Sequence, residues 1–294
     1  MKSNSVYLIV IVSTFLWGAN FALAGPILQD IPPLWAAALR FSFAALIMIV
    51  YASWRGEDLL SAVRRHGGIY LLIGAVGIGG FNLLFFAAMR TATASDAALI
   101  MATNPLLTTL LAAIALGERP TRRFLISLPL ALLGVIIVIS GGNVARLLHL
   151  QIVSGDFLML AADIVWAFYN VLSRSAMPKL SALTNTTLVM TSGALLLLTV
   201  VLFSGESLSM PGIPAGIALA LMVTGGTILA YLFWNTGIAS LGAARTALFM
   251  NLIPVFTMLV VAIMGNLPSL VQLIGGALVI SGVSINMLPR NRLT

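Results

Sequence analysis

Apolar residues occur in ten long runs along the chain, and polar and charged residues gather in the short segments between them. Each run approaches the roughly 20 residues that a helix needs to cross the hydrocarbon core of a bilayer. A membrane β-barrel would instead show short strands of alternating polarity. We therefore predict ten transmembrane helices, at residues 7–24, 34–54, 69–89, 94–115, 123–140, 155–173, 183–203, 214–236, 243–263 and 270–288.

The pattern also repeats within the chain. Ala98, Leu99, Met101, Pro105, Thr108 and Leu110 recur as Ala247, Leu248, Met250, Pro254, Thr257 and Leu259, an offset of 149 residues, at which Trp17 also matches Trp166. Each half, 1–143 and 150–290, then holds five helices. Because five is odd, the second half must cross the membrane upside down. The predicted fold is an all-α integral membrane protein of two inverted five-helix repeats, which place a substrate site near the midplane and permit alternating access.

The composition indicates that lipid is the main solvent of this chain. The chain is 60% hydrophobic and 8% charged, with a mean hydropathy of +1.09, whereas a soluble domain is about 25% charged. Cysteine is absent, and His66 and His149 fall in predicted loops. We therefore expect no metal site and no cofactor.

The net charge of +7 follows from membrane topology, because basic residues concentrate in cytoplasmic connections. With the N terminus inside, only Arg90 and Arg146 fall outside. The twelve inside are Lys2, Arg55, Arg64, Arg65, Arg119, Arg122, Arg123, Arg174, Lys179, Arg245, Arg290 and Arg292. This bias predicts a multi-pass protein of a bacterial cytoplasmic membrane with both termini cytoplasmic. No basic run is long enough to follow nucleic-acid phosphates, so nucleic acid is not an expected partner.

The first helix also has features of a signal peptide, because Lys2 precedes an apolar stretch that ends in Ala22-Leu23-Ala24-Gly25. Trp17 and Asn20 place bulky and polar groups late in that stretch, as a functional span would. The repeat also needs this helix. We therefore expect a retained transmembrane helix.

Polar and aromatic side chains recur on the first, third and fourth helices of each half. Polar groups are costly in lipid and face the protein interior or water. We predict a central cavity for a small organic molecule with an apolar and a polar part. Its candidate lining residues are Trp17, Asn20, Asn82, Phe86, Met101, Asn104, Trp166, Tyr169, Asn170, Tyr231, Asn235, Met250 and Asn251. Each amide could instead bond a neighbouring helix, and each aromatic ring could lie at the headgroup level.

Pro105 and Pro254 are predicted to interrupt their helices, because proline has no N–H and frees the carbonyl four residues earlier. Those carbonyls belong to Met101 and Met250. The two prolines are hinge candidates, with a simple packing kink as the alternative.

Arg40 and Asp163 are the charges deepest in the predicted spans. Asp163 is the candidate for proton coupling, with a structural hydrogen-bond acceptor as the alternative. Arg40 is expected to extend to the outer interface or to bind a cluster of carbonyls. The glycines of Gly74-x2-Gly77-x-Gly79-Gly80 lie inside an apolar helix with no preceding strand, so they favour close helix packing over nucleotide binding.

Several motifs resemble those of EamA-type transporters of the drug/metabolite transporter superfamily. They are Trp17-Gly18-Ala19-Asn20-Phe21, Leu39-Arg40-Phe41, Asn104-Pro105-Leu106-Leu107-Thr108, Leu116-Gly117-Glu118-Arg119-Pro120-Thr121, Asn251-Leu252-Ile253-Pro254-Val255-Phe256-Thr257 and Gln272-Leu273-Ile274-Gly275-Gly276. The resemblance implies a cavity from helices one, three, four, six, eight and nine, with helices five and ten as a scaffold. Met264-Gly265-Asn266 departs from the family's Leu-Gly-Glu, which puts a carboxylate role in the second half in doubt.

The repeat and the resemblance together indicate a secondary transporter that exports small metabolites, most simply amino acids and related compounds, by alternating access. The aromatic-rich cavity is similar to the YddG type of exporter for aromatic amino acids. A channel or a lipid or drug flippase of the same fold is the alternative. An enzyme is not expected, because the spans hold no His or Cys and one well-placed Asp. The expected partners are a small-molecule substrate and the lipid bilayer, with the chain a monomer or weak dimer.

Overall fold

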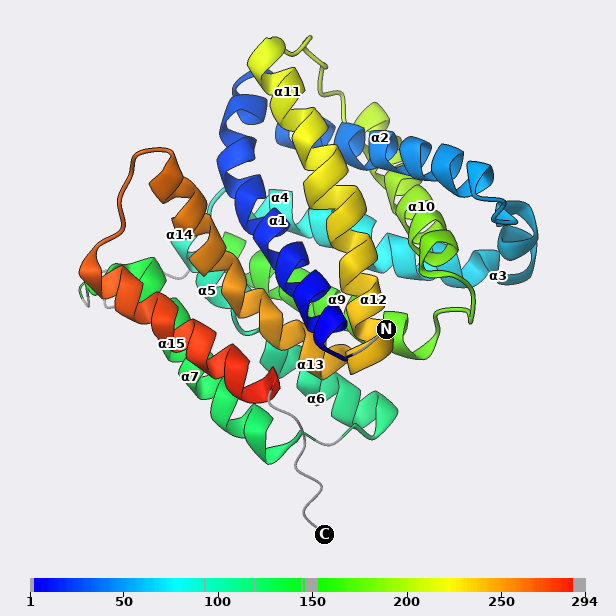
Figure 1. Ribbon diagram of the computed structural model, residues 1–294. Helices are drawn as coiled ribbons and strands as arrows, with labels where there is room; N and C mark the ends of the chain where they lie inside the picture. The colour runs from blue at the N-terminus through cyan, green and yellow to red at the C-terminus, as the bar shows by residue number, and fades with distance from the viewer. Residues whose placement is uncertain (1–2, 93, 119, 144, 146–152, 288–294) are drawn as a thin grey trace.

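The computed structural model describes residues 3–92, 94–118, 120–143, 145 and 153–287, and over these the chain is helical (Figure 1). The first half contains α1 (Ser3–Asp30), α2 (Pro33–Trp54), α3 (Leu59–Gly74), η1 (Ala75–Gly80), α4 (Phe81–Ala88), α5 (Ala94–Met101), α6 (Asn104–Leu116) and α7 (Arg122–Ser140). The second contains α9 (Ser154–Ser175), α10 (Ala182–Phe203), α11 (Ile213–Leu221), η2 (Met222–Leu229), α12 (Ala230–Leu241), α13 (Ala243–Ala247), η3 (Leu248–Leu252), α14 (Ile253–Ile263) and α15 (Leu270–Met287). The sequence predictions for Lys2, Arg119, Arg146, His149, Arg290 and Arg292 lie outside the described residues.

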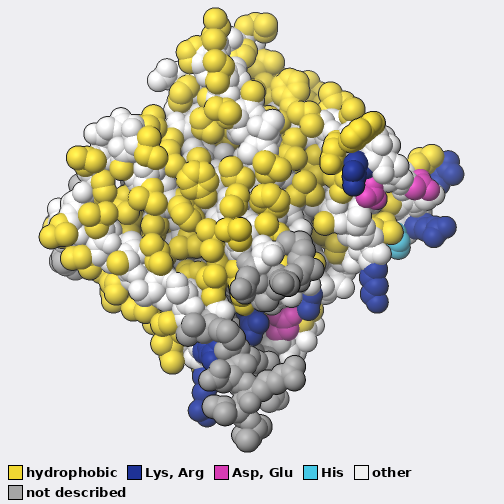
Figure 2. Space-filling model, in the orientation of Figure 1, with side chains coloured by type: hydrophobic (Ala, Val, Ile, Leu, Met, Phe, Trp, Pro, Cys, Tyr) yellow, Lys and Arg dark blue, Asp and Glu magenta, His cyan; other side chains and the backbone are white. Residues whose placement is uncertain are grey.

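Nine helical segments of the described chain are long and apolar enough to cross a membrane, and Leu270–Ile285 of α15 is a shorter apolar helix. Four of the nine spans are composite, because Leu59–Ala88, Ala97–Leu116, Ile213–Leu241 and Ala243–Ile263 each join two or more of the elements above. Hydrophobic side chains cover most of the face in Figure 2, and Lys and Arg lie toward its right and lower edges. The all-helical membrane fold predicted from the sequence is confirmed.

The third span begins at Leu59 rather than at residue 69, so the prediction that His66 lies in a loop is wrong. Asp58 explains the earlier start, because its side chain accepts a hydrogen bond from the backbone N–H of Ser61 at 3.0 Å and caps α3. The basic residues beside His66 therefore lie on a helix that continues into the bundle.

The two halves pack crosswise. Helix α1 lies against α12 and α14 of the second half, and α9 lies against α4 and α6 of the first half. The second helices of the halves, α2 and α10, pack on each other, as do the fifth helices, α7 and α15 (Figure 1). This exchange of equivalent contacts is what two inverted repeats around a pseudo-twofold axis produce, and it places α1 and α9 at the centre.

Helices α7 and α15 approach closely through glycine. A Cβ atom added at Gly134 would lie 2.6 Å from the carbonyl oxygen of Gly275, and one added at Gly282 would lie 2.8 Å from the backbone nitrogen of Ala131. Small residues let membrane helices pack at short range. Glycine thus lets the two helices pack tightly on each other, and the predicted lining residues lie on other helices.

Candidate functional site

A cavity of about 940 Å³ lies between the two halves. Pockets of this size suit small organic ligands. Nine of the predicted lining residues lie on its wall: Trp17, Asn20, Asn82, Phe86, Met101, Trp166, Tyr231, Met250 and Asn251. The hinge candidate Pro254 lines it as well.

Three aromatic rings form one side of the cavity. The ring centroids of Trp17 and Trp166 are 5.6 Å apart, and that of Tyr231 lies 5.6 Å from Trp17 and 5.9 Å from Trp166. The indole N–H of Trp17 donates to the carbonyl oxygen of Gly226 at 3.1 Å, and that of Trp166 donates to the sulfur of Met250 at 3.2 Å. Each indole is thus held by a group of the second half. Trp166 and Tyr231 are buried except where they line the cavity, whereas Trp17 is partly exposed.

Two amides on the wall have unsatisfied hydrogen-bonding atoms. Among the described residues, neither Oδ1 of Asn20 nor Oδ1 and Nδ2 of Asn251 has a partner, although all three atoms are buried. Asn82 differs, because its Nδ2 donates to the carbonyl oxygen of Ile78 at 2.7 Å within its own helix. A buried polar atom without a partner carries a desolvation cost that a ligand can relieve. Asn20 and Asn251 are therefore the stronger candidates for polar contacts, and a rearrangement of the wall must expose the fully buried amide of Asn251 to the ligand.

Arg40 of α2 lines the same cavity, a position for which the sequence analysis gave no binding role. Its Nη1 donates to the sulfur of Met222 at 3.6 Å, and its Cζ lies 4.5 Å from the ring centroid of Phe41. Its Nε is buried without a hydrogen-bond partner in the described chain. The expected carbonyl cluster is therefore wrong, since the described residues give this guanidinium no carbonyl partner.

Asp163 lies behind the wall in a closed polar network. Its side chain is fully buried, and its oxygens accept hydrogen bonds from Asn104 Nδ2 at 2.7 Å and Thr103 Oγ1 at 3.0 Å. Asn104 Oδ1 in turn accepts from Asn170 Nδ2 at 3.3 Å, and Asn170 Oδ1 accepts from the indole N–H of Trp234 at 3.0 Å. These contacts join the fourth span of the first half to the first and third spans of the second half.

A second buried network contains the remaining predicted lining residues. Tyr169 Oη donates to Asn235 Oδ1 at 2.7 Å, and Asn235 Nδ2 donates to Thr186 Oγ1 at 3.1 Å. Asn104, Tyr169, Asn170 and Asn235 are thus bonded between helices rather than exposed on the cavity wall. Within the described chain, no group of three or more His, Asp or Glu side chains is arranged to hold a metal ion.

Two π-helical segments, η1 and η2, occupy matching places in the third span of each half, a feature that the sequence analysis missed. In both, glycine lets the backbone contact the opposite half. A Cβ atom at Gly77 would lie 1.9 Å from the ring of Tyr169, and one at Gly226 would lie 1.9 Å from Oδ1 of Asn20. Both pairs match at the 149-residue offset. In the sequence, the cluster from Gly74 to Gly80 indicated close helix packing at η1, but it did not indicate the wider turn of a π-helix.

The two prolines lie beside real breaks in the fourth span of each half, as predicted. Helix α5 ends at Met101 before α6 begins, and the 3₁₀ segment η3 precedes α14. Pro105 and Pro254 stand in the first turn of the helix after each break, where proline costs no hydrogen bond. Pro254 lines the cavity, whereas Pro105 is buried outside its wall.

The cavity extends to one end of the bundle. Its wall includes Pro33 at the start of α2 and Leu267 between α14 and α15. At the opposite end, Arg174 Nη1 donates to the carbonyl oxygen of Ala239 at 2.6 Å, and Arg174 Nε lies 3.5 Å from a carboxylate oxygen of Glu118. Of these contacts, the one with Glu118 joins the two halves at the end that the cavity does not reach.

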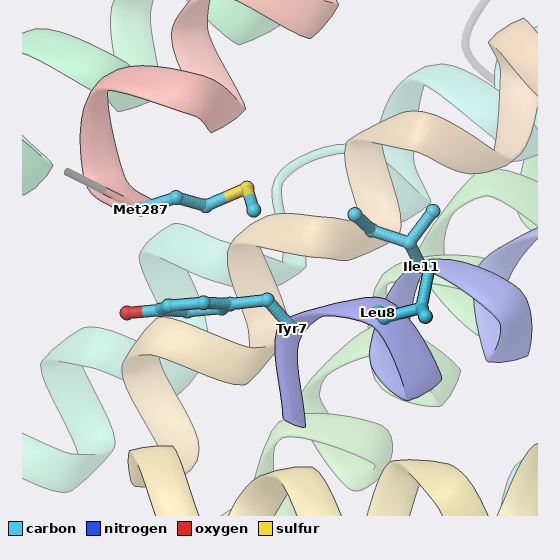
Figure 3. A pocket seen from close by; sticks show the side chains of 4 residues that line it. All are labelled: Tyr7, Leu8, Ile11 and Met287. Atoms are coloured by element: carbon cyan, nitrogen blue, oxygen red, sulfur yellow. The ribbon is translucent and has the colours of Figure 1, made fainter. Parts of the chain in front are cut away.

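A smaller hollow of about 370 Å³ lies at the edge of the bundle and is lined by Tyr7, Leu8, Ile11 and Met287. Figure 3 shows the Met287 side chain across from the Tyr7 ring, with the tyrosine hydroxyl pointing away. The hollow has no charged lining residue and few polar groups, so it is the weaker candidate site. Its place shows that α1 begins beside the end of α15, so these two ends lie on the same side of the bundle.

Comparison with known proteins gives one family for both halves. The model of the EamA-like transporter family matches residues 4–140 and again residues 153–288. The uncharacterized transporter YyaM of Bacillus subtilis is 36% identical, over 96% of this chain and 93% of its own length. A probable amino-acid metabolite efflux pump of Escherichia coli is 28% identical, over 97% of this chain and 95% of its own length.

A crystal structure of another protein has the same fold. The match has a TM-score of 0.79 at 22% identity and covers 96% of this chain and 97% of that one. At this identity the likeness concerns the arrangement of helices alone.

Proposed function

Since this chain belongs to the EamA-like transporter family, we propose that it exports amino acids and related metabolites through the cavity between its two halves. The family consists of transporters, so the chain is a multi-pass membrane transporter and not an enzyme. The name of the Escherichia coli relative supports an amino-acid-like substrate. The observation that carries the proposal is the pairing, on one wall, of aromatic rings with unpartnered amides.

The two kinds of side chain divide the work of binding. An apolar substrate part stacks on Trp17, Trp166 and Tyr231, and aromatic pairs contribute about 0.5–1.5 kcal/mol beyond the area that they bury. Polar substrate groups bond Asn20 and Asn251, at about 0.5–1.5 kcal/mol net for each hydrogen bond. An aromatic amino acid, as in YddG-type exporters, satisfies both requirements.

We further propose that both termini are cytoplasmic, on the charge bias of the connections. The end of the cavity at Pro33 and Leu267 then faces outward, and the contact between Arg174 and Glu118 closes the cytoplasmic side. Export then requires a second state, in which these contacts break and the outer end closes. The breaks beside Pro105 and Pro254 are the proposed hinges. We expect the chain to act as a monomer or weak dimer.

Asp163 is the proposed proton-coupling residue. Its carboxylate is fully buried. Its hydrogen-bond donors are Thr103, which lies in the break between α5 and α6, and Asn104, which begins α6. A proton gained or lost there changes hydrogen bonds at the proposed hinge of the fourth span. Proton exchange would thus bias the equilibrium between the two states.

The proposal is tested by reconstituting the purified protein in liposomes and measuring uptake of a panel of aromatic, aliphatic and polar amino acids, with and without a pH gradient. We expect saturable uptake and counterflow of at least one member, with aromatic or large neutral residues preferred. Uptake that rises linearly with concentration and shows no counterflow would indicate a channel. Movement of labelled lipid without movement of any amino acid would indicate a flippase.

A further inference from the structure

We propose that Arg40 binds a carboxylate of the transported molecule, so that the substrate class narrows to organic anions and zwitterions with an apolar part. This inference rests on the proposed transport function. It adds a residue outside the six helices to which the family resemblance assigns the cavity.

The position of Arg40 is the first argument. It lies within the α2 span, Pro33–Trp54, and lines the central cavity instead of extending to the lipid face. Among the described lining residues it is the one charged side chain, since the wall contains neither Asp nor Glu. An isolated cation inside a membrane protein is costly unless an anion or strong dipoles compensate it. The cavity therefore favours an anion beside α2.

The weak partners of Arg40 are the second argument. A guanidinium has five N–H donors, yet the described chain gives it one long contact to a thioether and the face of one ring, that of Phe41. Its Nε is buried and unpartnered. An arginine held for structure alone would be bonded to carbonyls or carboxylates. A planar fork with free donors instead matches the two oxygens of a carboxylate.

The surroundings of Arg40 explain why the anion would be organic. The ring of Phe41 lies 5.7 Å from that of Tyr231, which also contacts Trp17 and Trp166. Phe41 is fully buried behind the wall, so its ring anchors the guanidinium next to Tyr231 and the two tryptophans of the cavity. A carboxylate at Arg40 leaves an attached apolar group among the tryptophans, and an ammonium group can bond the amide oxygens of Asn20 and Asn251.

The test compares molecules that differ only in this charge. The probes are 3-phenylpropionate with 3-phenylpropionamide, phenylalanine with phenylalaninamide, and leucine with leucinamide. Binding is followed by tryptophan fluorescence and by thermal stabilisation of the purified protein. In the native chain we expect each carboxylate to bind roughly 10- to 100-fold more tightly than its amide, the range for one charged hydrogen-bonded contact.

Substitution of Arg40 should remove that preference. In Arg40→Gln the two members of each pair should bind equally, and Arg40→Lys, which keeps the charge but loses the fork, should retain part of the difference. Arg64→Gln, on the exposed face of α3 and away from the cavity wall, should keep the full preference. If Arg40→Gln does not fold, the comparison of Arg40→Lys with the native chain carries the test.

Three other outcomes would contradict the role of Arg40, and they differ in what they imply for the proposed transport. Equal binding of carboxylates and amides by the native chain would overturn the role of Arg40 and leave the proposed amino-acid transport standing. Failure of every probe to bind, together with no uptake of any amino acid, would overturn both. Competition by sulfate or chloride as strong as that by 3-phenylpropionate would show a site for inorganic anions and contradict an organic substrate.

Discussion

The wall of the cavity and the sealed network behind it are built from the same residue types but differ in how their polar atoms are used. Asn251 lines the cavity with both amide atoms unpartnered, whereas Asn104 is bonded to Asp163. Both stand beside the proline of their half, but Asn104 precedes Pro105 directly and Asn251 lies three residues before Pro254. The two amides therefore differ by two positions in register, and Asn251 lies in the 3₁₀ segment η3 whereas Asn104 begins α6, so their surroundings differ. Register, rather than residue type, separates binding from packing.

The first helices of the halves differ in the same way. At the 149-residue offset Asp163 matches Thr14, whose hydroxyl donates within its own helix to the carbonyl oxygen of Ile11 at 2.8 Å. At this position the first helix of the second half therefore presents a carboxylate to the fourth span of the first half, whereas the first helix of the first half presents none to its counterpart. The buried carboxylate thus belongs to the second half, whereas side chains of both halves line the cavity.

The largest expected effect is on thermal stability, and it should differ between substitutions of Asn104 and of Asn251. Asn104→Leu leaves Asp163 with one hydrogen-bond donor in a closed interior, and an unsatisfied buried group costs about 1–3 kcal/mol, more when it is charged. Asn251→Leu removes atoms that have no partner, so stability should be unchanged or slightly higher. Thermal unfolding in detergent measures both. Equal destabilisation by the two substitutions would contradict the division into wall and network.

The next effect concerns coupling within the network. Asp163→Asn keeps the shape of the side chain, and its amide can still accept from Asn104 and donate to Thr103. We therefore expect a folded protein that exchanges solute but no longer responds to a pH gradient. Uptake into proteoliposomes with and without the gradient measures this, with Asn170→Asp as a control that adds a carboxylate one step along the network. Unchanged gradient dependence in Asp163→Asn would leave facilitated diffusion as the simpler account.

The smallest effect on stability is expected for the hydrogen bond between Thr184 and Glu57, which lies near the surface of the bundle. Hydrogen bonds from the hydroxyl groups of Thr184 and Ser181 hold the pKa of Glu57, in the α2–α3 connection, below its ordinary value. The contact therefore stabilises the fold above that pKa, and this contribution is lost as the pH falls through the lowered value. Thr184→Val should reduce this acid dependence, with a smaller loss of stability than Asn104→Leu. Unfolding profiles between neutral and acidic pH test it, and a loss as large as that of Asn104→Leu would break the ranking.

Much of this architecture could be predicted from the sequence. The repeat placed Trp17 and Trp166 at matching positions on the first helix of each half, and an inverted pair of five helices must bring those helices to the same centre. The prolines likewise marked the breaks in the fourth spans. These features depend on periodicity and on symmetry, both of which are properties of the chain alone.

The division between wall and network could not be predicted, because it depends on helix rotation set by packing. The contacts of Gly77 with Tyr169 and of Gly226 with Asn20 fix that rotation, and the π-helical turns around them shift the register of the third spans. Arg40 was missed for the same reason. Its helix pairs with α10 at the edge of the fold, and only the assembled bundle turns its guanidinium into the cavity.

The most direct test of the central claim, that this cavity binds the transported solute, is the apparent affinity of four variants in proteoliposomes, normalised to folded protein. Trp17→Ala and Trp166→Ala each remove one aromatic contact and should weaken affinity about tenfold or less, since about 1.4 kcal/mol is a factor of ten. Ile137→Ala and Val279→Ala alter the packing of α7 against α15 at two positions that do not line the cavity, so they should leave affinity nearly unchanged. Affinity lost equally in all four variants would contradict the claim.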